Sequence, residues 1–178
     1  MTDEVRVREA QPGDEAAIRA VTLGAYEQYA GHMRAHWEGY RRNILDTLAA
    51  PGPAQRLVAE DAGAIVGSVI LYPPGTVGIT AGARPIGGEW PEVRLLAVDP
   101  AVRGRGVGLL LMQACVDRAR AAGAAALALH TTDMMASAMR LYERMGFERA
   151  PELDFQPAPG IIVKGFLLAL DRPSRQAL

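Results

Sequence analysis

A glycine- and arginine-rich stretch, 103-RGRGVG-108, is the first part of the sequence whose residue types could do chemistry. It lies between the apolar run 93–98, which predicts a buried strand, and the segment 107–122, whose apolar residues recur at helical spacing. A turn from a strand into a helix directs backbone N–H groups outward at the positive end of the helix dipole. The stretch therefore predicts a site for a phosphate or pyrophosphate group. The alternative is a structural turn with two solvent-facing arginines.

Two common nucleotide-binding motifs do not fit this stretch. A P-loop requires Lys and then Ser or Thr after its last glycine, whereas Gly108 is followed by Leu109. A dinucleotide-binding fingerprint requires a third small residue at the position that Leu109 occupies. We therefore expect neither nucleotide hydrolysis nor a Rossmann-type dinucleotide site.

Hydrophobic periodicity and chain-breaking residues predict the elements that would position the turn. Strands are expected at 4–10, 55–61, 64–72, 93–98, 124–130 and 161–170, with a short strand after Phe147. Helices are expected after an N-cap at Asp14, at 33–50, at 107–122, and at 134–146 between a cap at Asp133 and Gly146. The turn at Ala62 and Gly63 predicts a hairpin, and the Pro- and Gly-rich stretches 73–91 and 151–160 are expected to be loops.

Length and composition indicate one globular domain. The chain has 178 residues, and we expect a single domain over 1–171 with a frayed tail at 172–178. A formal net charge of −1 argues against nucleic acid as a partner. The N-terminus lacks a signal-peptide pattern and no apolar run reaches the roughly 20 residues that span a bilayer, so we expect a cytoplasmic protein without a membrane partner. The single cysteine, Cys115, is expected to be a buried, inert thiol.

Four features, in this order, resemble the GNAT superfamily of acetyl-CoA-dependent N-acetyltransferases. They are an acidic residue that opens a strand, the apolar strand 93-VRLLAV-98, the turn 99-DPAVRGRGVG-108 and the segment 141-LYERMGF-147. The resemblance implies an α/β fold with a mixed, mostly antiparallel sheet that is splayed at its centre and carries helices on both faces. It also implies acetyl-CoA as the co-substrate and no metal.

The resemblance assigns the coenzyme site to the centre of the chain. Backbone amides of the turn would bind the pyrophosphate, and the strand end would offer its backbone to the pantetheine arm. The residues implied are Leu96, Ala97, Val98, Arg103, Gly104, Arg105, Gly106, Val107 and Gly108. Many family members place an asparagine where this chain has Met135, so Ser137 or a threonine hydroxyl at 131 or 132 would have to replace that contact.

The resemblance also implies catalytic residues. Tyr142 matches the tyrosine that protonates the coenzyme A thiolate, a task for which a phenol with an ordinary pKa near 10 is suited. Two residues are candidates for the base that deprotonates the amine, Glu92 at the head of a strand and His130 at the end of another, with Glu89 as a third. A backbone N–H within 95–98 would stabilise the oxyanion.

We expect direct transfer of the acetyl group to a primary amine of a small molecule or amino acid derivative. No dense acidic surface is present that would indicate a polycationic acceptor. The alternatives are a protein N-terminus or side chain as acceptor, a longer acyl group, and a regulatory module that binds acetyl-CoA without turnover. The sequence leaves open whether the protein is a monomer or a homodimer.

Overall fold

One sheet of eight strands organises the residues that the computed structural model describes, 5–76 and 88–170. The strands are β1 (Arg6–Glu9), β2 (Gln55–Asp61), β3 (Ala64–Tyr72), β4 (Glu92–Val98), β5 (Ala126–Thr131), β6 (Glu148–Arg149), β7 (Phe155–Ala158) and β8 (Ile161–Ala169). Their order is β1-β2-β3-β4-β5-β8-β6, and β7 pairs with β8 beside this path. Only β4 and β5 are parallel among these pairs, so the sheet is mixed and mostly antiparallel, as expected.

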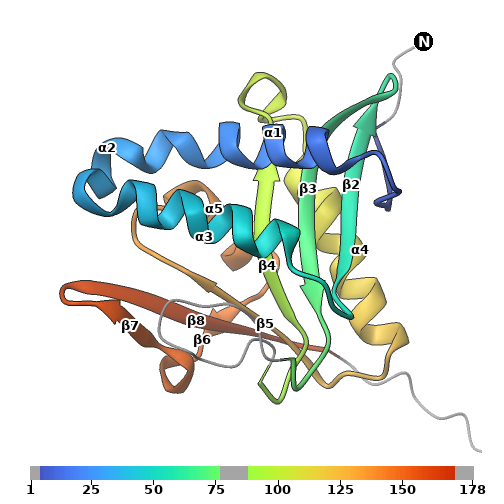
Figure 1. Cartoon of the computed structure of the whole chain (residues 1–178). Coiled ribbons are helices and arrows are strands. Elements are labelled where there is room, and N and C mark those ends of the chain that lie inside the picture. Colours follow the sequence, from blue (N-terminus) through green and yellow to red (C-terminus); the bar gives the residue numbers. More distant parts are fainter. Residues whose placement is uncertain (1–4, 77–87, 171–178) are drawn as a thin grey trace, which may run out of the picture.

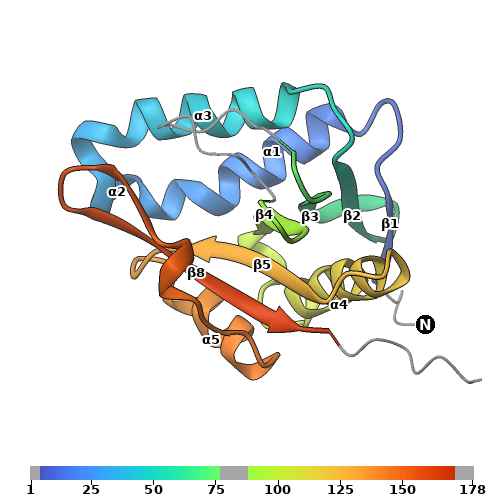
Figure 2. The same cartoon turned by 90° about the horizontal axis from the view of Figure 1, so that it is seen from below.

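Helices cover both faces of the sheet (Figures 1 and 2). On one face lie α1 (Glu15–Tyr26), α2 (Ala30–Met33) and α3 (Trp37–Ala49), and on the other lie α4 (Val107–Ala121) and α5 (Ala136–Arg144). Four short 3-10 turns connect elements: η1 (Glu27–Tyr29), η2 (Arg34–His36), η3 (Pro100–Val102) and η4 (Pro151–Leu153). This arrangement confirms the α/β class that the resemblance implied.

Each face of the sheet has its own hydrophobic core. The larger core lies between the sheet and α4 and includes the fully buried Leu57, Leu111 and Cys115. Burial raises the pKa of the Cys115 thiol to about 12, so the thiol stays protonated at neutral pH, and the prediction of a buried cysteine is confirmed. The smaller core joins α1 and α3 to the sheet around Tyr26 and Ile44.

The sheet splays where its single parallel pair separates. β4 pairs with β5 only at Glu92 and Val93, and β5 then runs away from β4 (Figure 1). On the other side of β4, Ser68 pairs with Ala97 and Ile70 with Arg94, so one residue of β3 (Val69) lies opposite two of β4 (Leu95 and Leu96). The extra residue makes a bulge in which Leu95 has a φ of 51°. The predicted splay at the centre of the sheet is therefore confirmed.

Local predictions were confirmed where short-range signals were strong. The hairpin of 55–61 and 64–72 is present, and its turn residues Ala62 and Gly63 both have positive φ, at 49° and 81°. Gly146 follows α5 with a φ of 90°, as a left-handed C-terminal residue should. The expected tail at 172–178 and most of the expected loop 73–91 lie outside the described residues.

Three local predictions were wrong, and a fourth was confirmed only in part. The helix expected at 33–50 is interrupted by η2, and the loop expected at 151–160 contains η4 and β7, because an edge strand tolerates its proline. The last helix begins at Ala136, and the carboxylate of Asp133 pairs with Lys164 instead of capping it. Asp14 does precede α1, but its side chain makes no cap bond with the helix and accepts instead from Arg8 and the amide of Gln11.

Candidate active site

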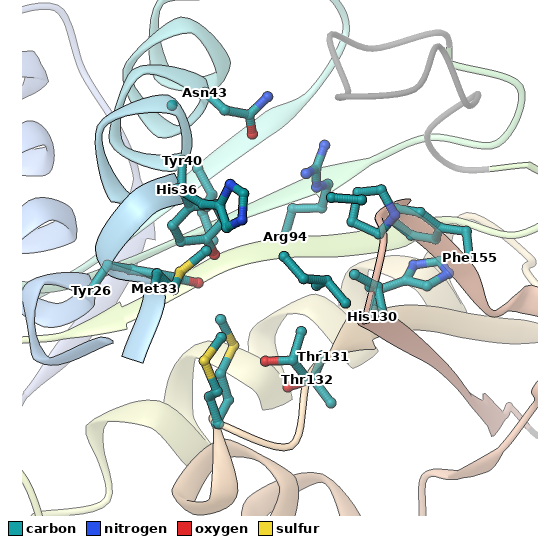
Figure 3. Close-up of a pocket in the computed structure, with 18 of the residues that line it drawn as sticks. Tyr26, Met33, His36, Tyr40, Asn43, Arg94, His130, Thr131, Thr132 and Phe155 are labelled. Carbon is teal, nitrogen blue, oxygen red and sulfur yellow. The ribbon is translucent and has the colours of Figure 1, made fainter. Parts of the chain in front are cut away.

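A cavity of about 400 Å³ opens beside the splay (Figure 3). Its walls come from α3 and the turns before it, from β4, from the end of β5 and the chain that follows it, and from the β7–β8 hairpin. Most of its lining is apolar, with Met33, Leu95 and Phe155 as examples, and Met135 lies in it as well. Polar groups therefore occur at a few defined positions.

Glu92 and His130, the two candidates for the base, are brought together in this cavity. Glu92 pairs in the sheet with Ala128, two residues before His130, so both side chains emerge on the same face. His130 Nδ1 lies 2.9 Å from Glu92 Oε1, and His130 Nε2 lies 3.0 Å from the carbonyl oxygen of Leu153 in η4. The side chains are only 11% and 9% exposed. The remaining candidate, Glu89, is exposed and lies outside the cavity lining.

The two hydrogen bonds of His130 restrict the protonation of the pair. A carbonyl oxygen only accepts, so Nε2 must carry a hydrogen and donate it to Leu153. The contact between Nδ1 and Glu92 then requires a second proton, held either by the imidazole or by the carboxyl group. Glu92 and His130 thus form one buried unit that shares a proton, either as imidazolium and carboxylate or as two neutral groups.

Tyr142 lies outside the cavity lining, in the larger core. It is 6% exposed, and its ring packs against Phe147 at a centroid distance of 5.9 Å. Burial is the largest cause that raises its pKa well above the usual value, followed by the nearby Tyr29, Cys115 and Tyr40. The phenol therefore stays protonated at neutral pH and is available as a hydrogen-bond or proton donor.

The glycine-rich turn has the geometry of an anion site. Gly104 and Gly106 have φ values of 80° and 79°, which only glycine adopts easily, and Gly106 is the N-cap of the 15-residue α4. The amide of Leu110 donates to the carbonyl of Gly106 at 3.0 Å, so the amides of Val107 and Gly108 precede the first intrahelical bond. These donors and the helix dipole together favour a bound anion.

The side chains of the two arginines in the turn interact with other residues of the chain. Arg103 donates to Gln28 Oε1 at 3.1 Å and to the carbonyl of Ala25 at 3.4 Å, which ties the turn to α1. Arg105 pairs with Asp61 at 2.7 Å. Both arginines are nevertheless exposed, so these bonds do not exclude the alternative of a structural turn with solvent-facing arginines.

The turn, the strand end and α5 meet at one point. A Cβ atom added to Gly108 would lie 3.4 Å from Leu141 Cδ2 and 3.7 Å from Val98 Cγ2. Leu96, Ala97 and Val98 follow the bulge, on the part of β4 that has no pairing with β5. The expected coenzyme-binding residues are thus contiguous in space.

Sequence reasoning missed Arg94, a polar residue of the cavity, whereas it had named the hydroxyls of Thr131 and Thr132 as candidate coenzyme contacts. Arg94, Thr131 and Thr132 line it, and among the described residues Arg94 Nη1 and both threonine Oγ1 atoms are buried without a hydrogen-bond partner. The signal for Arg94 was a single charge within the apolar strand 93-VRLLAV-98, two residues after Glu92.

None of the helices within residues 5–76 and 88–170 is long and apolar enough to cross a membrane. Within the same ranges, no group of three or more His, Cys, Asp or Glu side chains is arranged to hold a metal ion.

The splayed parallel pair and the glycine-rich turn that opens α4 beside it are features of the N-acetyltransferase fold. The chain belongs to the acetyltransferase (GNAT) family, whose model matches residues 18–147.

Relatives and solved structures agree with this membership. An IAA acetyltransferase from Azospirillum brasilense is 35% identical over 158 residues, which cover 87% of this chain and 92% of that protein. A mycothiol acetyltransferase from Thermobispora bispora is 30% identical over 150 residues, which cover 84% of this chain but 48% of that protein. A GNAT family acetyltransferase from Brucella melitensis, solved in complex with acetyl-CoA, superposes with a TM-score of 0.57 at 23% identity and covers 99% of this chain and 94% of its own. The structural similarity shows the fold.

Proposed function

We propose that the protein transfers the acetyl group of acetyl-CoA to a primary amine of a small molecule. The observation that carries this proposal is the buried Glu92–His130 pair in a cavity beside the splay of β4 and β5. Family membership supports the acetyl transfer, and the complex of the Brucella melitensis protein with acetyl-CoA supports the co-substrate. A cavity of about 400 Å³ suits a small acceptor better than a protein chain.

The residues present fit coenzyme A. The amides at the start of α4 would bind its pyrophosphate, with Gly104 and Gly106 allowing the backbone to face it. Backbone groups of Leu96 to Val98, which have no partner in β5, would bind the amide-rich pantetheine arm. Bound acetyl-CoA supplies an activated acetyl group as a thioester.

Glu92 is the base in this proposal, and His130 positions it. Both ring nitrogens of His130 are engaged, one by Glu92 and the other by Leu153, so the imidazole would have to break a bond to accept a proton from the amine. The carboxylate of Glu92 can accept that proton directly or through water while the imidazolium holds its Oε1. The sequence had left the choice between these two residues open.

The reaction balances without a covalent enzyme intermediate. The amine nitrogen forms a bond to the thioester carbonyl carbon, and a backbone N–H within 95–98 stabilises the oxyanion. The carbon–sulfur bond then breaks, the amine proton passes to Glu92, and the thiolate takes a proton from Tyr142. The products are the N-acetylated acceptor and coenzyme A with a free thiol.

The test is thiol release from acetyl-CoA across a panel of amines, with wild type beside Tyr142→Phe. We expect the variant to lose about two orders of magnitude in kcat for any amine that is turned over. The control is Tyr72→Phe, which removes an equally buried phenol, 6% exposed, that lies on β3 outside the cavity lining.

The second candidate function is an acetyl-CoA-binding module without turnover. It rests on Met135, which stands at the position of the family's usual asparagine and lines the cavity. Absence of thiol release with every amine, together with a melting temperature raised by acetyl-CoA, would favour this candidate and contradict the enzymatic proposal.

A further inference from the structure

Arg94 brings a positive charge into the cavity. It lies two residues after Glu92 on β4, so the alternation of strand side chains places the two on the same face. Both line the cavity, whereas Val93 between them also belongs to the larger core. Arg94 Nη1 is buried and has no hydrogen-bond partner among the described residues. A buried guanidinium donor is stabilised when a bound molecule brings an acceptor atom to it.

The cavity lining leaves the charge of Arg94 uncompensated. Glu92 is the sole acidic side chain among the described lining residues, and its Oε1 is bound by His130. Within the described residues, Arg94 has no ion pair. Figure 3 shows the guanidinium of Arg94 and the amide of Asn43 directed toward the same part of the cavity. A guanidinium and a primary amide together offer several N–H donors to one anion.

The positive charge of Arg94 affects three nearby tyrosine phenols. Burial raises the pKa of Tyr40 to about 12, and the positive charge of Arg94 opposes that rise. The same charge opposes the raised pKa values of Tyr26 and Tyr72. The guanidinium of Arg94 therefore lies near Tyr26 of α1 and Tyr40 of α3, which both line the cavity.

The rest of the cavity offers an apolar surface. Met33, Tyr40, Leu95, Met135, Phe155 and Ile161 line it. An acceptor that fills this cavity must therefore present an apolar body, since polar groups buried there without partners would be unfavourable.

We propose that the amine acceptor also carries a carboxylate and an apolar side group, and that Arg94 binds the carboxylate. This inference rests on the proposed function and specifies its substrate class. Glu92 and Arg94 are two residues apart, roughly 7 Å along a strand, so an amine beside Glu92 leaves a nearby carboxylate within reach of the guanidinium. Apolar amino acids are the simplest molecules with all three groups.

The first experiment compares acceptors that differ only in the carboxylate. L-phenylalanine is paired with 2-phenylethylamine and with L-phenylalanine amide, and L-methionine with 3-(methylthio)propylamine. We expect kcat/KM to be higher for each carboxylate by about tenfold or more, as a charge-assisted bidentate pair should give. Arg94→Gln should bring the ratio close to one, and Arg94→Lys should keep part of it. Arg120→Gln, an exposed arginine on α4 outside the cavity lining, is the matched control and should keep the full ratio.

The second experiment measures binding without turnover. N-acetyl-L-phenylalanine and its amide are titrated into wild type and Arg94→Gln by calorimetry. We expect the acid to bind wild type more tightly than the amide and this preference to vanish in the variant. Equal turnover of neutral and carboxylate acceptors would overturn the inference and leave the proposed function standing. Absence of turnover with a preserved, Arg94-dependent binding preference would overturn the proposed function and leave only the carboxylate-binding role of Arg94 standing. If the protein prefers the carboxylate compound over its neutral counterpart in neither experiment, Arg94 does not select a carboxylate.

Discussion

Gly165, the sheet partner of His130, leaves room for η4 beside the Glu92–His130 pair, and we expect its replacement by alanine to disturb that pair. Gly165 pairs with His130 across β5 and β8. A Cβ atom added there would lie 2.4 Å from Leu153 Cβ and 3.0 Å from the carbonyl oxygen of Ala150. Ordinary contacts between carbon atoms are about 3.5–4.0 Å, so η4 would have to move by roughly 1 Å or more. The neighbour is close to the backbone, and a rotamer change does not relieve the overlap.

The displacement of η4 has two consequences. His130 Nε2 donates to the carbonyl of Leu153 at 3.0 Å, and a shift of about 1 Å takes that bond beyond hydrogen-bonding distance. Overpacking costs about 1–3 kcal/mol, and a buried bond to a charged group contributes about 1.5–3 kcal/mol. The two costs together predict that the free energy of unfolding falls by about 2.5–6 kcal/mol, which lowers Tm by roughly 5–24 °C for a chain of this size.

Activity should fall with stability in Gly165→Ala. Without its bond to Leu153, His130 no longer holds Glu92 in one orientation, and we expect kcat to drop about tenfold while KM for acetyl-CoA stays the same. Thermal unfolding and steady-state thiol release at a temperature well below Tm measure the two effects. Adding Leu153→Gly to this variant removes the Cβ at 2.4 Å and should restore part of the stability and part of kcat.

The control for this prediction is Gly24→Ala. Gly24 lies on α1, has no positive φ, and an added Cβ would meet nothing within 4 Å. Alanine should raise the stability there by about 0.5–1 kcal/mol, because glycine is unfavourable in helices. If Gly165→Ala melts at the wild-type temperature with an unchanged kcat, η4 does not depend on Gly165 and the positioning argument is wrong.

Three other perturbations test separate parts of the site. Glu92→Gln should lower kcat by about 10²–10⁴-fold as a lost general base, with the calorimetric Kd of acetyl-CoA unchanged; a kcat near wild type would exclude Glu92 as the base. Gly106→Ala, at a φ of 79°, should cost about 1–2 kcal/mol of stability and raise KM for acetyl-CoA, measured by urea unfolding and kinetics. Burial raises the pKa of Tyr142 in the folded state, so deprotonation favours the unfolded chain. Tyr142 should therefore leave the free energy of unfolding unchanged below pH 10. Above pH 10 it should lower that free energy by up to about 1.4 kcal/mol per pH unit. Urea unfolding at alkaline pH measures this slope, which Tyr142→Phe should reduce.

The elements that short-range patterns specify could be read from the sequence alone. The hairpin at Ala62 and Gly63, the glycine-rich turn before α4 and the end of α5 at Gly146 depend on residues within a few positions of one another. Such signals act through local backbone preferences and through the period of apolar residues. The family resemblance came from the same central segment and led correctly to the splayed sheet.

Contacts between distant residues were decided only by tertiary structure. Glu92 and His130 are 38 residues apart, and their hydrogen bond depends on the parallel register of β4 and β5. β7 exists because it pairs with β8, although its proline indicated a loop. Arg94 became a candidate for binding a carboxylate only because the structure shows that its Nη1 is buried without a hydrogen-bond partner among the described residues. The sequence by itself determined which reactive side chains the protein has and which segments carry them. The packing of those segments determined which side chains meet, because register and burial depend on the whole sheet.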